Sequence, residues 1–212
     1  MDELELLKKD WKKQGENYPR HSYEALSKMI WKRSSSIVKW IFVISILEFL
    51  FWAILNIFLA DEAYWKEMEL INLKEFTIGV YIIGYAITFF FIWQFYKNYI
   101  KISSTDDSAT LMKNILKTRK TVKYYIGYVI ISTAITSLVY LYFTFKYHMN
   151  NTAAEEAVSY DFNFNQWLLF IGMMTIGILV FLGIIWLFYR LLYGILLKRL
   201  SKNYKELMKL QI

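Results

Sequence analysis

The sequence predicts an all-α polytopic membrane protein, an antiparallel, left-handed four-helix transmembrane bundle whose helices continue into the cytoplasm. The first observation is composition: 57% of the 212 residues are hydrophobic and 20% are charged, against about 45–50% and about 25% in soluble domains. The second is three charge-free stretches, residues 76–96, 124–145 and 162–189. Because about 20 apolar residues cross a bilayer as a helix, this pattern excludes a soluble enzyme and a disordered chain.

A fourth apolar stretch, residues 40–60, precedes these three and contains one acid, Glu48. All four are uniformly apolar over about 20 residues, whereas the strands of membrane barrels alternate over about 10, so helices are expected. We therefore predict a transmembrane bundle over residues 37–197, between a cytoplasmic amphipathic segment (1–36) and a cytoplasmic helical tail (198–212). The predicted spans are about 40–60, 76–96, 124–145 and 167–189.

Lysine and arginine are distributed unevenly among the connecting segments. Residues 1–39, 97–123 and 190–212 carry nine, seven and six of them, whereas residues 61–75 and 146–166 carry two and one. Because these residues accumulate in cytoplasmic loops, both termini are expected in the cytoplasm. The first residues are acidic and lack an apolar core, so no signal peptide is expected.

Glu48 is the strongest candidate for a functional residue, because an ionisable group inside a span is costly and marks a functional site by default. Thr88 and Ser132 lie as many residues inside their spans as Glu48 does, and Thr133 follows directly. Equal depth predicts one intramembrane polar cluster of Glu48, Thr88, Ser132 and Thr133. Three interpretations remain open: a structural hydrogen bond made by a neutral acid, a site that handles protons or cations, and a contact with a partner's helix.

The N-terminal segment carries a second candidate surface. Leu4, Leu7 and Trp11 share one face of a short helix, far from any span. This face would serve as a membrane-surface anchor, as intramolecular packing, or as a binding surface for a partner. Further along, Ser22 is the expected N-cap of a helix that continues into the first span.

The sequence offers few residues or motifs that could support catalysis or bind a metal ion. It has no cysteine, and its two histidines, His21 and His148, are expected on opposite sides of the membrane, so they cannot share a metal or a haem. No catalytic or phosphate-binding motif is present, and we expect no enzyme activity, cofactor or metal. Membrane insertion accounts for the basic residues, so nucleic-acid binding is not expected. Tyrosines near the span ends are interpreted as interfacial belts.

Two strings carry a resemblance to a known family: Lys-Lys-Asp-Trp-Lys-Lys at residues 8–13, and Ser-Ser-Ser-Ile-Val-Lys-Trp-Ile at residues 34–41. They resemble a family of short bacterial four-span proteins that are often encoded beside an alternative sigma factor. The resemblance implies an inner-membrane regulatory protein, anti-sigma-like, with its N-terminal segment in the cytoplasm. The sequence lacks the His/Cys signature of zinc-type anti-sigma domains, so its mode of sigma-factor binding would differ.

Three functions are consistent with these observations. The first is a non-enzymatic regulatory or scaffold protein of the bacterial inner membrane that binds a soluble, sigma-factor-like partner through its N-terminal segment. The second is a small channel or proton-coupled transport component that uses Glu48. The third is an accessory subunit whose spans contact another membrane protein. We expect the first of these functions, the regulatory or scaffold role.

Overall fold

Nearly all of the described part of the chain is helical. The computed structural model describes residues 5, 8, 22–104, 107–156 and 164–210, and no strand occurs among them. The helices are α2 (Tyr23–Leu59), α3 (Glu62–Leu70), α4 (Lys74–Ser103), α5 (Ser108–Glu156), α6 (Phe164–Tyr189), a π-helical turn η1 (Arg190–Gly194) and α7 (Ile195–Leu210). The all-α prediction is confirmed.

Four helical segments are long and apolar enough to cross a membrane. They are Glu24–Leu59, Lys74–Ser103, Ser108–Tyr147 and Leu168–Lys209. Large hydrophobic side chains cover their outer surfaces; Leu179 on α6, for example, is 62% exposed. Because soluble monomers rarely expose large contiguous apolar patches, this surface is compatible with a membrane protein.

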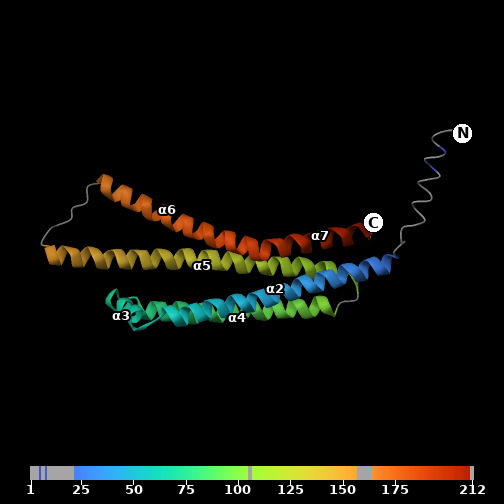
Figure 1. Cartoon of the computed structure of the whole chain (residues 1–212), viewed down its shortest axis with the longest axis horizontal. Coiled ribbons are helices and arrows are strands. Elements are labelled where there is room, and N and C mark those ends of the chain that lie inside the picture. The colour runs from blue at the N-terminus through green and yellow to red at the C-terminus, as the bar shows by residue number, and fades with distance from the viewer. Residues whose placement is uncertain (1–4, 6–7, 9–21, 105–106, 157–163, 211–212) are drawn as a thin grey trace.

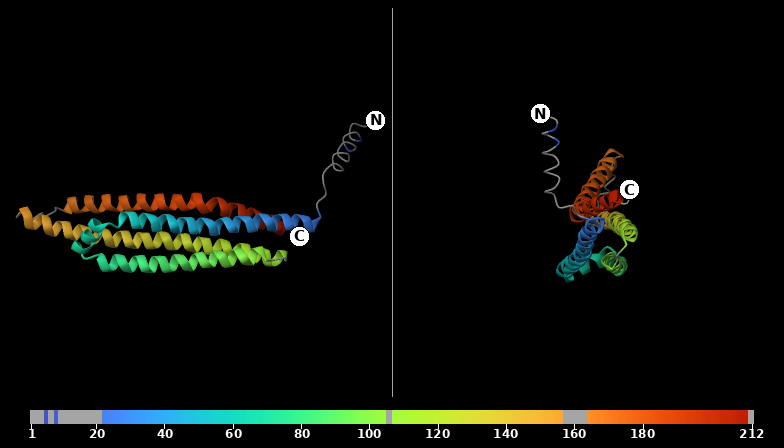
Figure 2. Two further views of the ribbon diagram at one scale, coloured as in Figure 1. Left: turned by 60° about the horizontal axis from the view of Figure 1, so that its bottom comes forward. Right: turned by 90° about the vertical axis from the view of Figure 1, so that its right-hand side faces the viewer.

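The long helices form an elongated antiparallel bundle that is tight at one end and open at the other. The start of α2 and the end of α7 lie at the same end, on the right in Figure 1, whereas α6 diverges from α5 toward the opposite end. Figure 2 shows the helices end-on, grouped around a common axis. We call the tight end the terminal bundle; it consists of residues 23–41, 95–103, 108–125 and 189–210.

The terminal bundle has its own hydrophobic core. Its central members are Ile30, Val38, Ile102, Leu111, Ile115, Leu200 and Leu207. Polar groups link the helices around this core: the Trp31 indole donates to the carbonyl oxygen of Ile102 at 2.8 Å. Asn203 Nδ2 donates to Ser34 Oγ at 3.0 Å. The described parts of the predicted N-terminal segment and C-terminal tail thus pack against one another, and α2 runs without a break from residue 23 into its apolar part.

Side-chain caps fix where the helices begin. Ser22 accepts a hydrogen bond from the Ala25 backbone N–H at 3.2 Å, as its residue type predicts. The Asp61 side chain likewise accepts a hydrogen bond from the Tyr64 backbone N–H, at 2.8 Å, at the start of α3. The sequence pattern predicts only a connecting loop over these residues. Asn72 adopts the left-handed conformation (φ 56°) that asparagine tolerates and that reverses the chain from α3 into α4.

A π-helical turn joins α6 to α7. The helix changes direction at this turn, where the two labelled segments meet at an angle in Figure 1. π-turns widen the helix and are a known cause of kinks, frequently at functional sites. This turn carries Tyr193, which is fully buried.

Candidate functional site

Glu48 lies at the border between the terminal bundle and the open region, and its carboxyl group is the focus of three tyrosines. The carboxylate oxygen Oε1 accepts hydrogen bonds from the hydroxyls of Tyr125, at 2.8 Å, and Tyr189. Oε2 accepts from the Tyr193 hydroxyl at 2.8 Å. Glu48 is only 6% exposed, so these hydroxyls replace the water that a carboxyl group would otherwise bind.

The direction of the helices explains why two of these tyrosines, Tyr189 and Tyr193, reach Glu48. Side chains lean toward the N-terminus of their own helix. Because α2 starts at the terminal bundle and α6 ends there, Glu48 leans toward the bundle, and Tyr189 and Tyr193 lean toward Glu48. The rings of Tyr189 and Tyr193 stack, with centroids 6.0 Å apart and planes 9° apart, and the Tyr125 ring meets both edge-on.

A layer of buried apolar side chains separates the Glu48 site from the core of the terminal bundle. Ile41, Phe95 and Val122 are fully buried and belong to the same cluster as the three tyrosines. On the opposite side, the carboxyl group borders a cavity of about 550 Å³ between α2, α4, α5 and α6. Glu48 therefore borders the cavity, and the apolar layer separates it from the core of the terminal bundle.

The predicted polar cluster lies around this cavity, but its hydrogen bonds differ from those expected. Glu48, Thr88, Ser132 and Thr133 all line the cavity. The Thr88 hydroxyl, however, donates to the carbonyl oxygen of Gly84 at 2.8 Å, and the Ser132 hydroxyl to that of Val129 at 3.1 Å. Short hydroxyl side chains commonly bond back to their own helix in this way. The hydrogen-bond partners of Glu48 are therefore corrected to the three tyrosines.

Sequence reasoning missed these tyrosines because it matched depth along the helix axis alone. Tyr125 and Tyr189 lie at the ends of charge-free stretches and were interpreted as interfacial residues. A tyrosine is long enough to bring its hydroxyl well beyond its own Cα level. The available signal was the pair Tyr189 and Tyr193, since residues four apart share a helix face.

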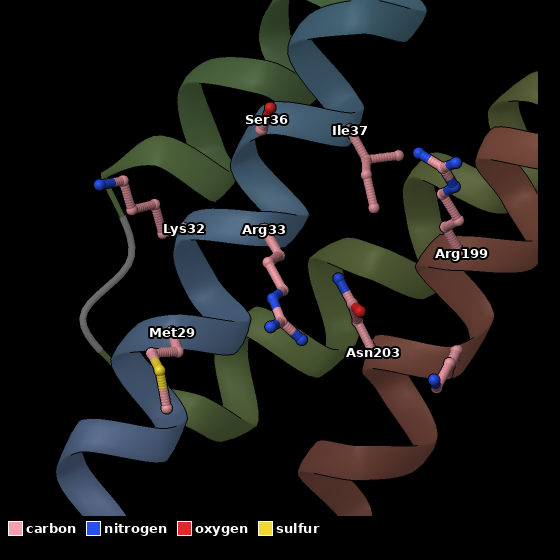
Figure 3. Close-up of a pocket in the computed structure, with 8 residues that line it drawn as sticks. Met29, Lys32, Arg33, Ser36, Ile37, Arg199 and Asn203 are labelled. Carbon is pink, nitrogen blue, oxygen red and sulfur yellow. The ribbon is translucent and has the colours of Figure 1, made fainter.

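A basic groove forms the second concave feature, on the terminal bundle between α2 and α7. It has a volume of about 560 Å³, and Met29, Lys32, Arg33, Ser36, Ile37, Arg199, Lys202 and Asn203 line it. Figure 3 shows Arg33 and Asn203 facing each other across the two helices, with Arg199 one turn away. Of the cations in the groove, Lys202 forms an ion pair with Glu206, one turn further along the same helix, at 3.8 Å.

A known protein family matches most of the chain. Residues 24–212 match the profile of a domain of unknown function (DUF8845). The chain belongs to the DUF8845 family. Neither the curated proteins nor the solved structures that were compared give a match.

The DUF8845 match includes both features described above, the Glu48 site and the basic groove. The predicted binding face of Leu4, Leu7 and Trp11 precedes the matched region and lies outside the described residues. Among the described residues of this DUF8845 chain, no group of three or more His, Cys, Asp and Glu side chains is placed to hold a metal ion.

Proposed function

We propose that the protein is a non-enzymatic regulatory or scaffold protein of the bacterial inner membrane that binds a soluble, acidic partner at its terminal bundle. In this proposal the four apolar helical segments span the bilayer and both termini are cytoplasmic. The segment distribution of Lys and Arg supports this orientation. The terminal bundle would then extend from the membrane into water as a rigid platform.

The observation that carries this proposal is the basic groove. Insertion requires cations on the cytoplasmic side, but it does not require them to gather around one concavity between two helices distant in sequence. Arg33 and Arg199 come from opposite ends of the chain. Guanidinium groups favour carboxylates and phosphates as partners, so an acidic protein surface fits this groove. The resemblance to proteins encoded beside sigma factors makes a sigma-factor-like protein the first partner to test.

The N-terminal segment supplies the second half of the proposed interface. Met29, Lys32 and Arg33 in the groove belong to the predicted binding segment 1–36. An apolar contact through Leu4, Leu7 and Trp11 would add affinity next to the charged groove, because aromatic anchors commonly dominate binding energy.

Site-specific photo-crosslinking in native membranes tests this proposal. A photo-reactive residue at Met29, which lines the groove and is 39% exposed, is expected to capture a soluble protein. The same residue at Leu179, on the apolar surface of α6, serves as the matched control. Reversing charge with Arg33→Glu and Arg199→Glu should abolish capture. Adducts to lipid only, or capture that survives charge reversal, would contradict the proposal.

A second candidate function rests on Glu48. Its carboxyl group borders a cavity within the apolar helices and is held by three hydroxyl donors. Such a group suits a proton-coupled transport component. Purified protein in vesicles, with a pH gradient and an interior pH dye, would test it: dissipation of the gradient that Glu48→Gln removes supports this function. Gradients that persist as long as in protein-free vesicles would contradict it.

A further inference from the structure

The cavity beside Glu48 has an unbalanced charge composition. Of the residues that line it, Glu48 is the only one with a carboxyl group, and none is Lys, Arg or His. An ionised carboxylate offers about four acceptor positions, and the three tyrosine hydroxyls occupy three of them. A buried charge without an opposite charge is costly, so a cation that enters the cavity would favour the ionised form of the Glu48 carboxyl group and pair with it.

Aromatic rings form much of the remaining wall. Half of the twenty lining residues are Phe, Tyr or Trp, from all four helices that enclose the cavity. Trp52 on α2, Tyr85 on α4 and Phe181 on α6 are examples. A cation near the face of such a ring is attracted by the ring's quadrupole, by about 2 kcal/mol when desolvated. The apolar parts of a ligand would contact the same rings.

The volume of the cavity indicates the size of the ligand. At about 550 Å³ it falls within the range of sites for small organic molecules, roughly 300–1,000 Å³. A proton or a bare metal ion would leave most of this space and the aromatic wall unused. A fatty-acid anion would find no cationic side chain among the residues that line the cavity.

We propose that this cavity binds a hydrophobic organic cation, with Glu48 as its counter-charge and the aromatic wall as the surface for its apolar substituents. The inference rests on the same carboxyl group as the second candidate function but not on the regulatory proposal. Binding is measured without a gradient, so its failure and a failure of proton coupling are distinguishable.

Gly84 provides a way to block the cavity without touching Glu48. It lines the cavity, and a Cβ atom added there would meet nothing within 4 Å. Gly84→Phe should therefore place a ring in the ligand's space. Gly79→Phe is the matched control, since Gly79 is on the same helix, has equally open surroundings and does not line the cavity.

Equilibrium dialysis of the purified full-length protein in neutral detergent tests the proposal. Tetraphenylphosphonium is the probe, and tetraphenylborate is its counterpart of similar size and opposite charge. We expect saturable binding of tetraphenylphosphonium at one site and none of tetraphenylborate at that site. Glu48→Gln and Gly84→Phe should each weaken binding at least about tenfold, whereas Gly79→Phe should bind like the unmodified protein.

Four results would overturn the proposal: no saturable binding of the cation, equal binding of the anion at the same site, unchanged affinity in a folded Glu48→Gln variant, or unchanged affinity in Gly84→Phe. Size-exclusion chromatography and circular dichroism establish that each variant is folded. If Glu48→Gln does not fold, the Gly84→Phe and Gly79→Phe pair and the comparison of the two probes still decide the outcome.

Discussion

The terminal bundle and the region around the cavity share α2, α4 and α5, joined by α7 in the first and by α6 in the second, but the two regions are packed very differently. Ten of the twelve largest fully buried side chains lie in the terminal bundle, and the other two, Leu73 and Thr77, lie at the far end beside α3. The stretch between them holds a cavity of about 550 Å³. This contrast agrees with the proposed topology: a part in water would have to bury its own apolar surface, whereas lipid tails are as apolar as leucine and do not force helices together.

Glu48 lies where these two regions meet, and so does the π-helical turn. Tyr189 ends α6 and Tyr193 lies within η1, so two of the three groups that hold Glu48 belong to the point where the helix bends. The helix that follows this turn, α7, carries Arg199, which lines the basic groove. The Glu48 carboxyl group is therefore in direct contact with the turn that joins α6 to α7.

The largest effect is expected from opening the core of the terminal bundle. Leu200→Ala removes a fully buried side chain and should lower the free energy of unfolding by about 2–5 kcal/mol. Leu179→Ala, on the exposed surface of α6, should change it little. Thermal unfolding of both variants in detergent measures the difference. Similar losses in the two variants would show that the two regions are not packed as differently as described.

The next effect is expected at the border, from removing the acceptor of three hydroxyls. Glu48→Leu removes this acceptor. The hydroxyls of Tyr125 and Tyr189, which share one oxygen, can pair with each other, whereas the buried Tyr193 hydroxyl loses its partner, at about 1–3 kcal/mol. Glu48→Gln keeps an acceptor and should cost less. Denaturant titration followed by tryptophan fluorescence compares the two variants. Equal stabilities for Gln and Leu would contradict the role of Glu48 as the centre of this network.

The difference between the regions also explains how far the sequence could predict the molecule. The helix class and four apolar segments follow from composition, and Glu48 stands out because it is a lone acid in an apolar stretch. The tyrosines could not be assigned, because aromatic residues at span ends are common for another reason. The cavity depends on the divergence of α6 from α5, which hydropathy and spacing along the chain do not indicate. The groove required knowing that residues near 33 and 199 meet.

A smaller effect is expected at the far end, where α3 covers the helices. The Tyr140 hydroxyl donates to Thr77 Oγ1 at 2.7 Å, and Thr77 donates onward to the Leu73 carbonyl at 2.8 Å. Tyr140→Phe should cost about 0.5–1.5 kcal/mol, the usual net contribution of one hydrogen bond. Tyr142→Phe, an exposed neighbour on the same helix, is the matched control. Thermal unfolding that does not separate the two variants would contradict this contribution.

The smallest effect is expected from Asp107, which caps the start of α5 in the terminal bundle. Its carboxylate accepts from the backbone N–H of Thr110 at 2.9 Å and from the Thr110 hydroxyl at 2.8 Å. These hydrogen bonds favour the ionised form and lower the pKa of Asp107 from its ordinary value of 3.8.

A lowered pKa in the folded state fixes the sign of the pH dependence. The stabilisation by Asp107 is present above pH 3.8 and is lost as the pH falls through the lowered pKa of the folded protein. Asp107→Asn keeps an oxygen that can accept from Thr110 but does not titrate. The stability difference between the original chain and this variant should therefore shrink toward low pH, whatever the remaining carboxyl groups contribute to both. Melting temperatures of both proteins across this range test it, and a constant difference would contradict the cap's charge as its source.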